Sequence, residues 1–573
     1  PHRAAWNPFR FYEGLCVRVG ENPISNIQNQ ISASTSLFFR MRGLCDSASP
    51  RLCVGFQGWG GRLCVFPLCL RTSVVLLKAG CFVIPWCLCA FVFATAEGGW
   101  EFKTQNPKLT LWVGNRRSQS ILDLMNQDIR ERPPRGMWSS ALWYADRTPE
   151  DRNRYVDFLR ALSILAVVLG HWLISAPYFE NGAPAYSHLL DLAPWSRWLT
   201  WLFQVMPVFF FVGGFSNGVS WASAKRKGLG YREWFSARTV RLIGPVLPLI
   251  LMWGAMVAVA HSNGVGPGMI HIGSKVALVP VWFLAVYIMV VALVPLTHAA
   301  WERVGFWSVL IPAGAAALVD VAFFAGGMRA LGWLNYPFVW LTVHQLGYAW
   351  QSGRLSGPRV GLTMFCGGAA ALLALTHLGP YPLSLVGVPS DEISNTLPPK
   401  VPLLALGAAQ IGLVLLFEKS ARRWLVKRVP WAATILVNGM IMTIFLWHST
   451  VMMLLVGLAF WHLPGVLAQM PDTAGWWWTR PLWIAVYTIV TLPFLLVFGR
   501  FERPGAGSTD RPVAVWLQLF GCGIACPGLA MLAMDGIGGD GWLGLRWIPL
   551  ALPLIGAGIA GFGPLKFLTR WSH

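Results

Sequence analysis

The stretch RYVDFLRALSILAVVLGH, residues 154–171, combines a long apolar run with an arginine and a histidine. About 20 helical residues cross the ~30 Å hydrocarbon core of a bilayer, so this run predicts a membrane-spanning helix. Arg160 and His171 stand eleven positions apart, which at ~100° per residue is three turns plus about 20°. Both side chains are therefore predicted to project from one face of the helix.

The same two residues are predicted to lie at different depths. At ~1.5 Å per residue, His171 lies roughly 16 Å further along the helix than Arg160. Arg160 is then near the cytoplasmic headgroups and His171 near mid-membrane. A lone buried histidine is usually a hydrogen-bonded packing residue, but ionisable groups in a bilayer are costly and therefore functional candidates. An arginine on the same stripe favours a functional pair.

The rest of the chain has the composition of a membrane protein. Of its 573 residues, 55% are hydrophobic and 12% are charged, whereas soluble domains carry about 25% charged residues. Backbone polar groups cannot stay unpaired in lipid, so each apolar run is predicted to be a helix. The predicted fold is all-α, a polytopic bundle of about 10–12 membrane helices. The apolar segments fall near 158–176, 198–221, 242–261, 276–297, 306–325, 334–351, 360–378, 401–418, 431–457, 481–499, 513–534 and 546–565.

The net charge of +20 is explained by topology. Lys and Arg cluster in alternate short loops between apolar segments, seventeen in one set of loops against six in the other. Positive loops stay in the cytoplasm, so both ends of the bundle are predicted to be cytoplasmic in the plasma (inner) membrane. No basic stripe interleaved with base-stacking aromatics is present, so nucleic acid is not an expected partner. The seventeen are Lys225, Arg226, Lys227, Arg232, Arg238, Arg241, Arg303, Arg354, Arg359, Lys419, Arg422, Arg423, Lys427, Arg428, Arg500, Arg503 and Arg511, and the six are Arg197, Lys275, Arg329, Lys400, Arg480 and Arg546.

Residues 1–136 differ from the bundle at 154–573. They hold eight of the eleven cysteines, but the spacing fits no zinc pattern, so no metal site is expected. One run, Ala79–Ala96, is long enough to be a membrane segment. Two interpretations stay open: an additional, poorly ordered region, or upstream sequence ahead of a true start at Met137. The sequence favours the second.

Further polar residues are candidates for function. Arg238 and Arg241, three residues apart, place two guanidinium groups on nearly one helix face, and such planar forks suit phosphate oxygens. Taken alone, the two arginines are explained more simply by positive-inside topology with snorkelling. Asp320 and His448 lie within apolar segments, and Asp320 would face His171 or His344 or sit at a helix end. Two other patterns are discounted: the GxSxG match at 214–218 lacks a strand-to-helix turn, and the GxGxxG match at 556–561 suits helix packing.

These residues resemble the membrane acyltransferase 3 family, an integral membrane O-acyltransferase family, over roughly 154–460. The first-helix block with its Arg–ten residues–His spacing is the specific element, and the other landmarks are weak singly. Gly213 stands where many members have serine, so no hydroxyl role is carried over there. The loop 390–399 resembles loops of actinobacterial members. The matching landmarks are Tyr155-Val-Asp157-Phe-Leu-Arg160 through His171, Pro207–Phe215, Arg238-Thr-Val-Arg241, Trp282-Phe283-Leu284 and Leu446-Trp447-His448.

The resemblance implies transfer of an acyl group from a cytosolic thioester, acyl-CoA, to a hydroxyl of a cell-envelope glycan, glycolipid or similar acceptor. It implies no tightly bound cofactor, and its partners are acyl-CoA, the acceptor and membrane lipids. Arg238 and Arg241, with Arg160, would hold the donor phosphates. His171 would act as general base or carry the acyl group as an acyl-imidazole. Asp157, His448, Asp320 and Trp282 are further candidates.

Three rival interpretations stand beside this one. Twelve segments with intramembrane Asp and His would suit a secondary transporter, but the halves show no similarity of the kind that repeated transporter folds show. A different membrane O-acyltransferase family centred on His344 would need an accompanying motif, which is not found. A purely structural role leaves the Arg160 and His171 spacing unexplained.

Overall fold

The computed structural model describes residues 133–134, 136–502 and 512–567, and the backbone of six strands between residues 54 and 112. The chain divides into two compact units, Pro1–Pro133 and Pro134–His573. The first contains an antiparallel sheet in the order β1-β2-β3-β4 and a separate pair, β5 and β6. These strands are Val54–Gly58, Gly61–Val65, Thr72–Leu77, Gly80–Pro85, Glu101–Lys103 and Thr110–Trp112. The candidate membrane segment at 79–96 contains β4 and otherwise lies outside the described residues.

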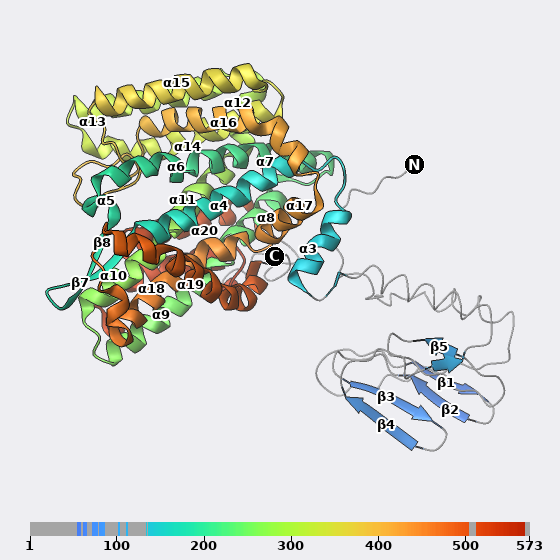
Figure 1. Ribbon diagram of the computed structural model, residues 1–573. Helices are drawn as coiled ribbons and strands as arrows, with labels where there is room; N and C mark the ends of the chain where they lie inside the picture. Colours follow the sequence, from blue (N-terminus) through green and yellow to red (C-terminus); the bar gives the residue numbers. More distant parts are fainter. Residues whose placement is uncertain are drawn as a thin grey trace. The chain divides into compact units, whose positions relative to one another are not determined.

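The second unit is a helix bundle (Figure 1). Among the described residues, ten helices are long and apolar enough to cross a membrane, which confirms the predicted polytopic bundle. Its elements are α3 (Met137–Asp146), α4 (Arg154–Ile174), β7 (Ser175–Glu180), β8 (Ala183–His188), α5 (Leu189–Leu192), η1 (Pro194–Leu199), α6 (Thr200–Phe203), α7 (Met206–Arg226), α8 (Tyr231–Ile243), α9 (Val246–Ser262), α10 (Pro267–Leu278), α11 (Val281–Ala292), α12 (Val294–Val304), α13 (Trp307–Phe324), η2 (Arg329–Leu334), α14 (Asn335–Gln351), α15 (Pro358–His377), α16 (Pro402–Trp424), α17 (Arg428–Asn438), α18 (Ile441–His462), η3 (Pro464–Leu467), α19 (Ala474–Phe498), η4 (Gly499–Glu502), α20 (Val515–Asp535), η5 (Trp542–Gly544) and α21 (Trp547–Ile559).

Three of the twelve predicted segments do not correspond to a single candidate membrane span. The segments near 334–351 and 546–565 form α14 and α21, which have 17 and 13 residues and are shorter than the ten candidate spans. The segment near 431–457 is divided into α17 and α18. The break falls at Gly439 and Met440, where glycine, a poor helix former, follows the end of α17.

The helix α4 begins and ends with defined local structure. Its N-terminus is capped by Asn153, whose side chain accepts a hydrogen bond from the Val156 N–H at 3.3 Å. After Ile174 the chain passes directly into the hairpin of β7 and β8. Its two-residue loop, Asn181 and Gly182, has positive φ at both positions, as a tight hairpin turn of this kind requires. The sequence analysis did not predict this hairpin.

Two close helix crossings account for the glycine patterns. A Cβ atom at Gly214 would collide with the backbone carbonyl of His344, and one at Gly347 would collide with the backbone of α7. Helices α7 and α14 therefore touch through their backbones, as small residues allow in membrane helices. Gly521 on α20 and Gly556 on α21 meet in the same way. Gly214 of the GxSxG match and Gly556 of the GxGxxG match are thus helix-packing glycines, as was predicted for the second match.

The bundle has a centre and a periphery. In α18, 67% of the most apolar window is buried inside the protein, against 17% in α15. Helix α15 lies at one edge of the bundle in Figure 1, whereas α4 and α11 lie within it. Since α4 packs against both α7 and α18, the residues of α4 singled out by the sequence analysis face the interior.

Candidate functional site

His171 on α4 is joined to His448 on α18. The distance between His171 Nδ1 and His448 Nε2 is 2.8 Å, and the rings lie nearly parallel with centroids 5.1 Å apart. The backbone of α18 also accepts a hydrogen bond from the Trp172 indole at its His448 carbonyl, at 3.2 Å. The two histidines singled out in the first and ninth predicted segments therefore form one pair.

The partners of His448 fix which nitrogen of His171 is free. The carbonyl of Phe445 lies 2.7 Å from His448 Nδ1, and a carbonyl can only accept, so Nδ1 of His448 carries the proton. In a neutral ring Nε2 is then an acceptor, so it accepts a hydrogen bond from the Nδ1–H of His171. The Ser449 hydroxyl, whose Oγ is 3.0 Å from the same Nε2, can also donate a hydrogen bond to it. Nε2 of neutral His171 is left with its lone pair, as in other pairs in which one group orients an imidazole.

A cavity of about 1320 Å³ runs past His171 of this pair. Its lining includes His171, Trp282, Gln204 and Phe445. Within the described part of the chain, no hydrogen bond is made to His171 Nε2. The cavity continues along α11 as far as Ala292, whose carbonyl accepts a hydrogen bond from the Tyr231 hydroxyl at the start of α8. A substrate in this cavity would therefore meet the free nitrogen of His171.

The other end of the cavity is roofed by loops. The segment between α15 and α16 contributes lining residues from Val386 to Leu397. Salt bridges hold this segment: Arg197 to Asp391 at 3.2 Å and Arg329 to Glu392 at 2.7 Å. His188, the last residue of β8, lines the same space. Burial lowers the pKa of His188 below its usual value, and the nearby Asp191 opposes that shift.

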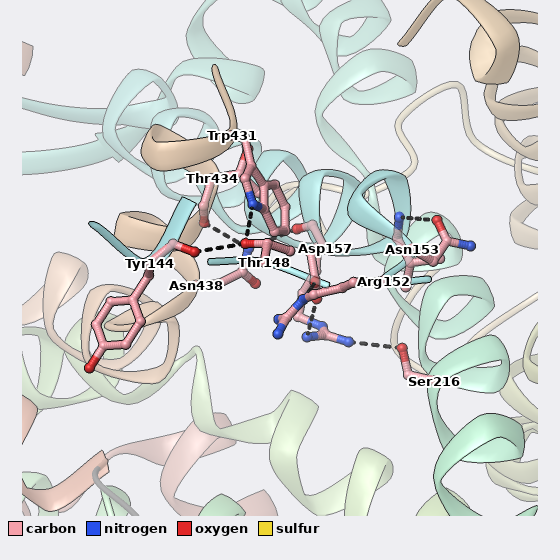
Figure 2. A network of polar contacts seen from close by, with 11 residues as sticks. Tyr144, Thr148, Arg152, Asn153, Asp157, Ser216, Trp431, Thr434 and Asn438 are labelled. Atoms are coloured by element: carbon pink, nitrogen blue, oxygen red, sulfur yellow. Dashed lines mark hydrogen bonds and ion pairs between the residues drawn. The ribbon is translucent and has the colours of Figure 1, made fainter. Parts of the chain in front are cut away.

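Arg160 belongs to a second polar cluster, at the start of α4, and Figure 2 shows its partners Asp157 and Ser216. Its guanidinium donates to Ser216 Oγ on α7 at 2.8 Å and lies 3.4 Å from Asp157 Oδ1. Asp157 also pairs with Arg152 at 2.8 Å, and its backbone carbonyl accepts from the Asn438 side chain. Asp157 therefore holds Arg160 in place rather than facing the cavity.

Arg238 and Arg241 on α8 join this cluster electrostatically. Arg238 interacts with Arg160, Arg241 and Tyr287, and Arg241 with Arg160, Asp157 and Glu502. In the described part of the chain, neither guanidinium makes a hydrogen bond or salt bridge; Arg238 has only the ring of Trp234 at 5.7 Å. Three positive groups therefore converge with donors unsatisfied, and guanidinium groups in this state suit phosphate.

Glu502 links the arginine cluster to the histidine pair. Its carboxylate accepts hydrogen bonds from the backbone N–H groups of Met442 and Thr443, both at 3.0 Å. It therefore caps the first turn of α18, the helix that carries His448. Glu502 was not among the predicted site residues, because its sequence neighbourhood does not indicate a contact with a helix sixty residues earlier.

His344 and Asp320 lie in separate polar groups. His344 Nε2 is 3.2 Å from the amide of Asn217, which also approaches Tyr287 at 3.4 Å. His344 does not line the cavity beside His171. The structure brings Asp320 to neither histidine. Its carboxylate accepts from Asn335, from the Tyr381 hydroxyl and from the Val401 N–H, at 2.8, 3.0 and 2.8 Å.

Asp320 thus ties the two ends of the segment between α15 and α16 to α13. Lys400, fully buried, points its ammonium at the Phe323 ring, 3.7 Å from the centroid. Burial lowers the pKa of Lys400 and raises that of Tyr381. We refer to Asp320, Asn335, Tyr381 and Val401 as the Asp320 cluster. Every oxygen of its carboxylate has a protein partner, so the cluster is structural in character.

Among the predicted site residues, the structure thus gathers two groups. His171 and Trp282 line the cavity and His448 is hydrogen-bonded to His171, while Arg160, Asp157, Arg238 and Arg241 form the arginine cluster. Each group has a member on α4, His171 in the first and Arg160 in the second, eleven residues apart. A membrane bundle with a free imidazole nitrogen in a cavity and a basic cluster beneath it has the parts of a membrane-embedded group-transfer enzyme.

The comparison with known families makes this class specific. Residues 153–500 match the model of the acyltransferase domain of the acyltransferase 3 family. The match covers more than half of the chain, and the protein belongs to this family of membrane acyltransferases. It includes both histidines and all three arginines. No curated protein and no solved structure matches the chain.

Proposed function

We propose that the protein transfers an acyl group from acyl-CoA to a hydroxyl of a cell-envelope glycan, glycolipid or similar acceptor. The observation that carries the proposal is the His171–His448 pair, whose free Nε2 opens into a cavity large enough for two substrates. Family membership supports the reaction class. The donor, the acceptor and the roles of single residues are proposals.

The donor would be held at the arginine cluster. Charge-assisted bonds from guanidinium groups to phosphate are about twice as strong as neutral hydrogen bonds. Arg238 and Arg241 have donors unsatisfied within the described chain, and Arg160 is fixed beside them by Asp157 and Ser216. The thioester arm would then extend along the cavity beside α11 toward His171, roughly 16 Å deeper along α4 than Arg160.

The chemistry follows from the free nitrogen. Nε2 of His171 takes the proton of the acceptor hydroxyl as its oxygen attacks the thioester carbonyl carbon. The carbon–sulfur bond breaks, and the imidazolium returns the proton to the departing thiolate. His448, held by the Phe445 carbonyl, accepts a hydrogen bond from the Nδ1–H of His171 and so stabilises the positive ring. A covalent acyl-imidazole is the alternative route through the same atom.

The orientation is part of the proposal. We place the arginine cluster at the cytoplasmic face of the plasma (inner) membrane because the loops at that end carry most of the Lys and Arg. The roofed mouth of the cavity then faces outward, where an envelope acceptor is found. The loop at 390–399 supports an actinobacterial-like member of the family.

The test measures thiol release and ester formation by the purified protein. Acetyl-CoA and palmitoyl-CoA serve as donors, with membrane extract of the producing cells as acceptor. We expect His171→Ala to lower transfer by roughly 10²–10⁴-fold, the usual contribution of a general base. The matched control is His462→Ala, the same change at an exposed position of α18.

Unchanged turnover in folded His171→Ala protein would remove the proposed chemistry. Solute exchange across proteoliposomes without thiol release would instead favour the transporter hypothesis. Rapid quenching distinguishes the two enzyme routes, because only the covalent route leaves label from the acyl group on the protein.

A further inference from the structure

The hairpin after α4 returns the chain to the end of that helix. Residues Ser175 and His188 are register partners in β7 and β8, and neighbouring strands lie about 4.8 Å apart. Ser175 follows His171 by four residues. His188 is thereby brought back to the histidine pair by a turn of only two residues, Asn181 and Gly182.

His188 shares the cavity with His171. Both rings line it, and they are close enough for charge on one ring to act on the other. Nδ1 of His188 is buried without a hydrogen-bond partner. No described residue forms a hydrogen bond with Nε2 of His188 either, and this atom, unlike Nδ1, is accessible rather than buried. An imidazole with both nitrogens unused beside a reactive cavity has capacity for a ligand.

The surroundings keep this imidazole neutral. Burial lowers the pKa of His188, while Asp191 on α5 raises it. Asp191 is itself engaged by Ser390 in the roofing segment, through the backbone N–H at 3.2 Å and the hydroxyl. A neutral ring offers one N–H donor and one acceptor, which matches a hydroxyl group on a substrate.

We propose that His188 is an acceptor-binding residue, which hydrogen-bonds the acceptor through Nε2 and holds its hydroxyl against Nε2 of His171. This inference rests on the proposed transfer reaction and adds a residue to it. His188 lies at the roofed end of the cavity, whereas the donor is assigned to the arginine cluster at the other end of α4. The residue therefore separates acceptor binding from donor binding.

The experiment measures steady-state transfer from acetyl-CoA to graded amounts of the membrane extract, together with acetyl-CoA hydrolysis without acceptor. In His188→Ala, we expect the half-saturating extract concentration to rise roughly 3- to 10-fold, the effect of losing one hydrogen bond. The acetyl-CoA KM and the acceptor-independent hydrolysis stay unchanged. His188→Gln, whose amide reaches the position of Nε2, restores part of the acceptor affinity.

Ser187→Ala is the matched control. It changes the neighbouring residue of β8, whose side chain points to the opposite face of the strand, and it should leave both constants unchanged. The thermal midpoint of each variant in detergent reports any loss of the hairpin fold.

The outcomes separate this inference from the proposed function. Loss of hydrolysis together with transfer in folded His188→Ala would overturn an acceptor-side role, as would an unchanged half-saturating concentration. In either case the reaction itself stands if His171→Ala abolishes transfer. Should His171→Ala remain active, the proposed function fails first.

Discussion

The histidine pair and the Asp320 cluster are both polar groups inside an apolar bundle, yet their hydrogen bonding differs. In the Asp320 cluster both carboxylate oxygens are occupied by protein donors. In the histidine pair, the rings are held by the hydrogen bond between them and by the bond from His448 Nδ1 to the Phe445 carbonyl. Nε2 of His171 has no partner in the described chain. The Asp320 carboxylate has a protein donor at each oxygen, whereas Nε2 of His171 keeps a free lone pair beside the cavity.

The difference shows how to sort intramembrane polar residues. Depth and residue type do not separate His171 from Asp320, since both lie within membrane helices and both are costly there. What separates them is whether the protein satisfies every donor and acceptor. A complete cluster stabilises the fold, and an incomplete one beside a cavity is available for chemistry. The following predictions test this distinction.

The largest effect is expected from Asp320→Ala, and it is an effect on stability. Asn335, Tyr381 and Val401 each lose a buried acceptor, and an unsatisfied buried group costs about 1–3 kcal/mol. The free energy of unfolding should fall by about 3 kcal/mol or more, measured by thermal or denaturant unfolding in detergent. Transfer per folded molecule should stay within about twofold, because the residue does not touch the cavity chemistry.

Asp320→Asn is the matched variant. It keeps one carbonyl oxygen that can accept from Tyr381 and Val401. If the Asn335 side-chain amide turns over, its unpartnered Oδ1 can accept from the new amide N–H. We expect near wild-type stability. A loss of transfer in this variant at full stability would show that Asp320 is more than structural.

His448→Ala should do the reverse. Removing the acceptor of the His171 Nδ1 proton frees the ring to rotate and to change tautomer, so kcat should fall by roughly 10- to 100-fold, the size seen when the orienting partner of a functional imidazole is lost. His448→Gln keeps an acceptor and should recover part of kcat. A destabilised His448→Ala protein whose kcat per folded molecule stays at the wild-type value would contradict the functional assignment.

The arginine cluster sharpens the comparison, because it too is incomplete. Arg238→Gln or Arg241→Gln should raise the acyl-CoA KM by roughly 10-fold or more, the equivalent of one charge-assisted hydrogen bond. The acceptor dependence should not change. The control is Arg226→Gln, at the exposed last residue of α7. An equal rise in KM from this variant would indicate an effect of general surface charge rather than a binding site.

The smallest effect is a pH dependence that depends on His188. Its folded pKa lies below the ordinary value, so the ring stays neutral above about pH 6.5 and protonates only on further acidification. Acceptor binding should weaken over that acidic range, and His188→Gln should remove this limb. Asp191→Asn takes away the charge that raises the pKa, so the limb should move to lower pH. A limb that persists in His188→Gln would assign the titration to another group. Other charged or titratable groups that line the cavity are His171, Lys275, Tyr336, Asp391, Glu392, Cys522, Cys526 and Asp535.

Much of the fold followed from the sequence, for physical reasons. Apolar length and alternating basic loops predict a membrane bundle directly, because lipid accepts little else. The boundary between α17 and α18 was missed because hydropathy does not register a helix break at Gly439. The hairpin of β7 and β8 was missed too, although Asn181 and Gly182 between extended residues are a recognised hairpin signal.

The candidate site was predicted in its types of residue more than in its contacts. Helical spacing placed Arg160 and His171 on α4, but it carries no information on which helix faces them. The pairing of His171 with His448, 277 residues apart in the chain, depends on tertiary packing. So do the carbonyl of Phe445 and the cap by Glu502, which no local pattern reveals.

The contact between α7 and α14 limits how this protein can move. Where two backbones meet at Gly214 and Gly347 without side chains between them, sliding or swivelling would drive atoms into one another, so the two helices behave as a single rigid body. Ser216, two residues after Gly214 on α7, holds Arg160 to that body. Entry and exit of substrates must therefore come from displacement of other helices or of the roofing segment, with the α7–α14 pair as the fixed frame.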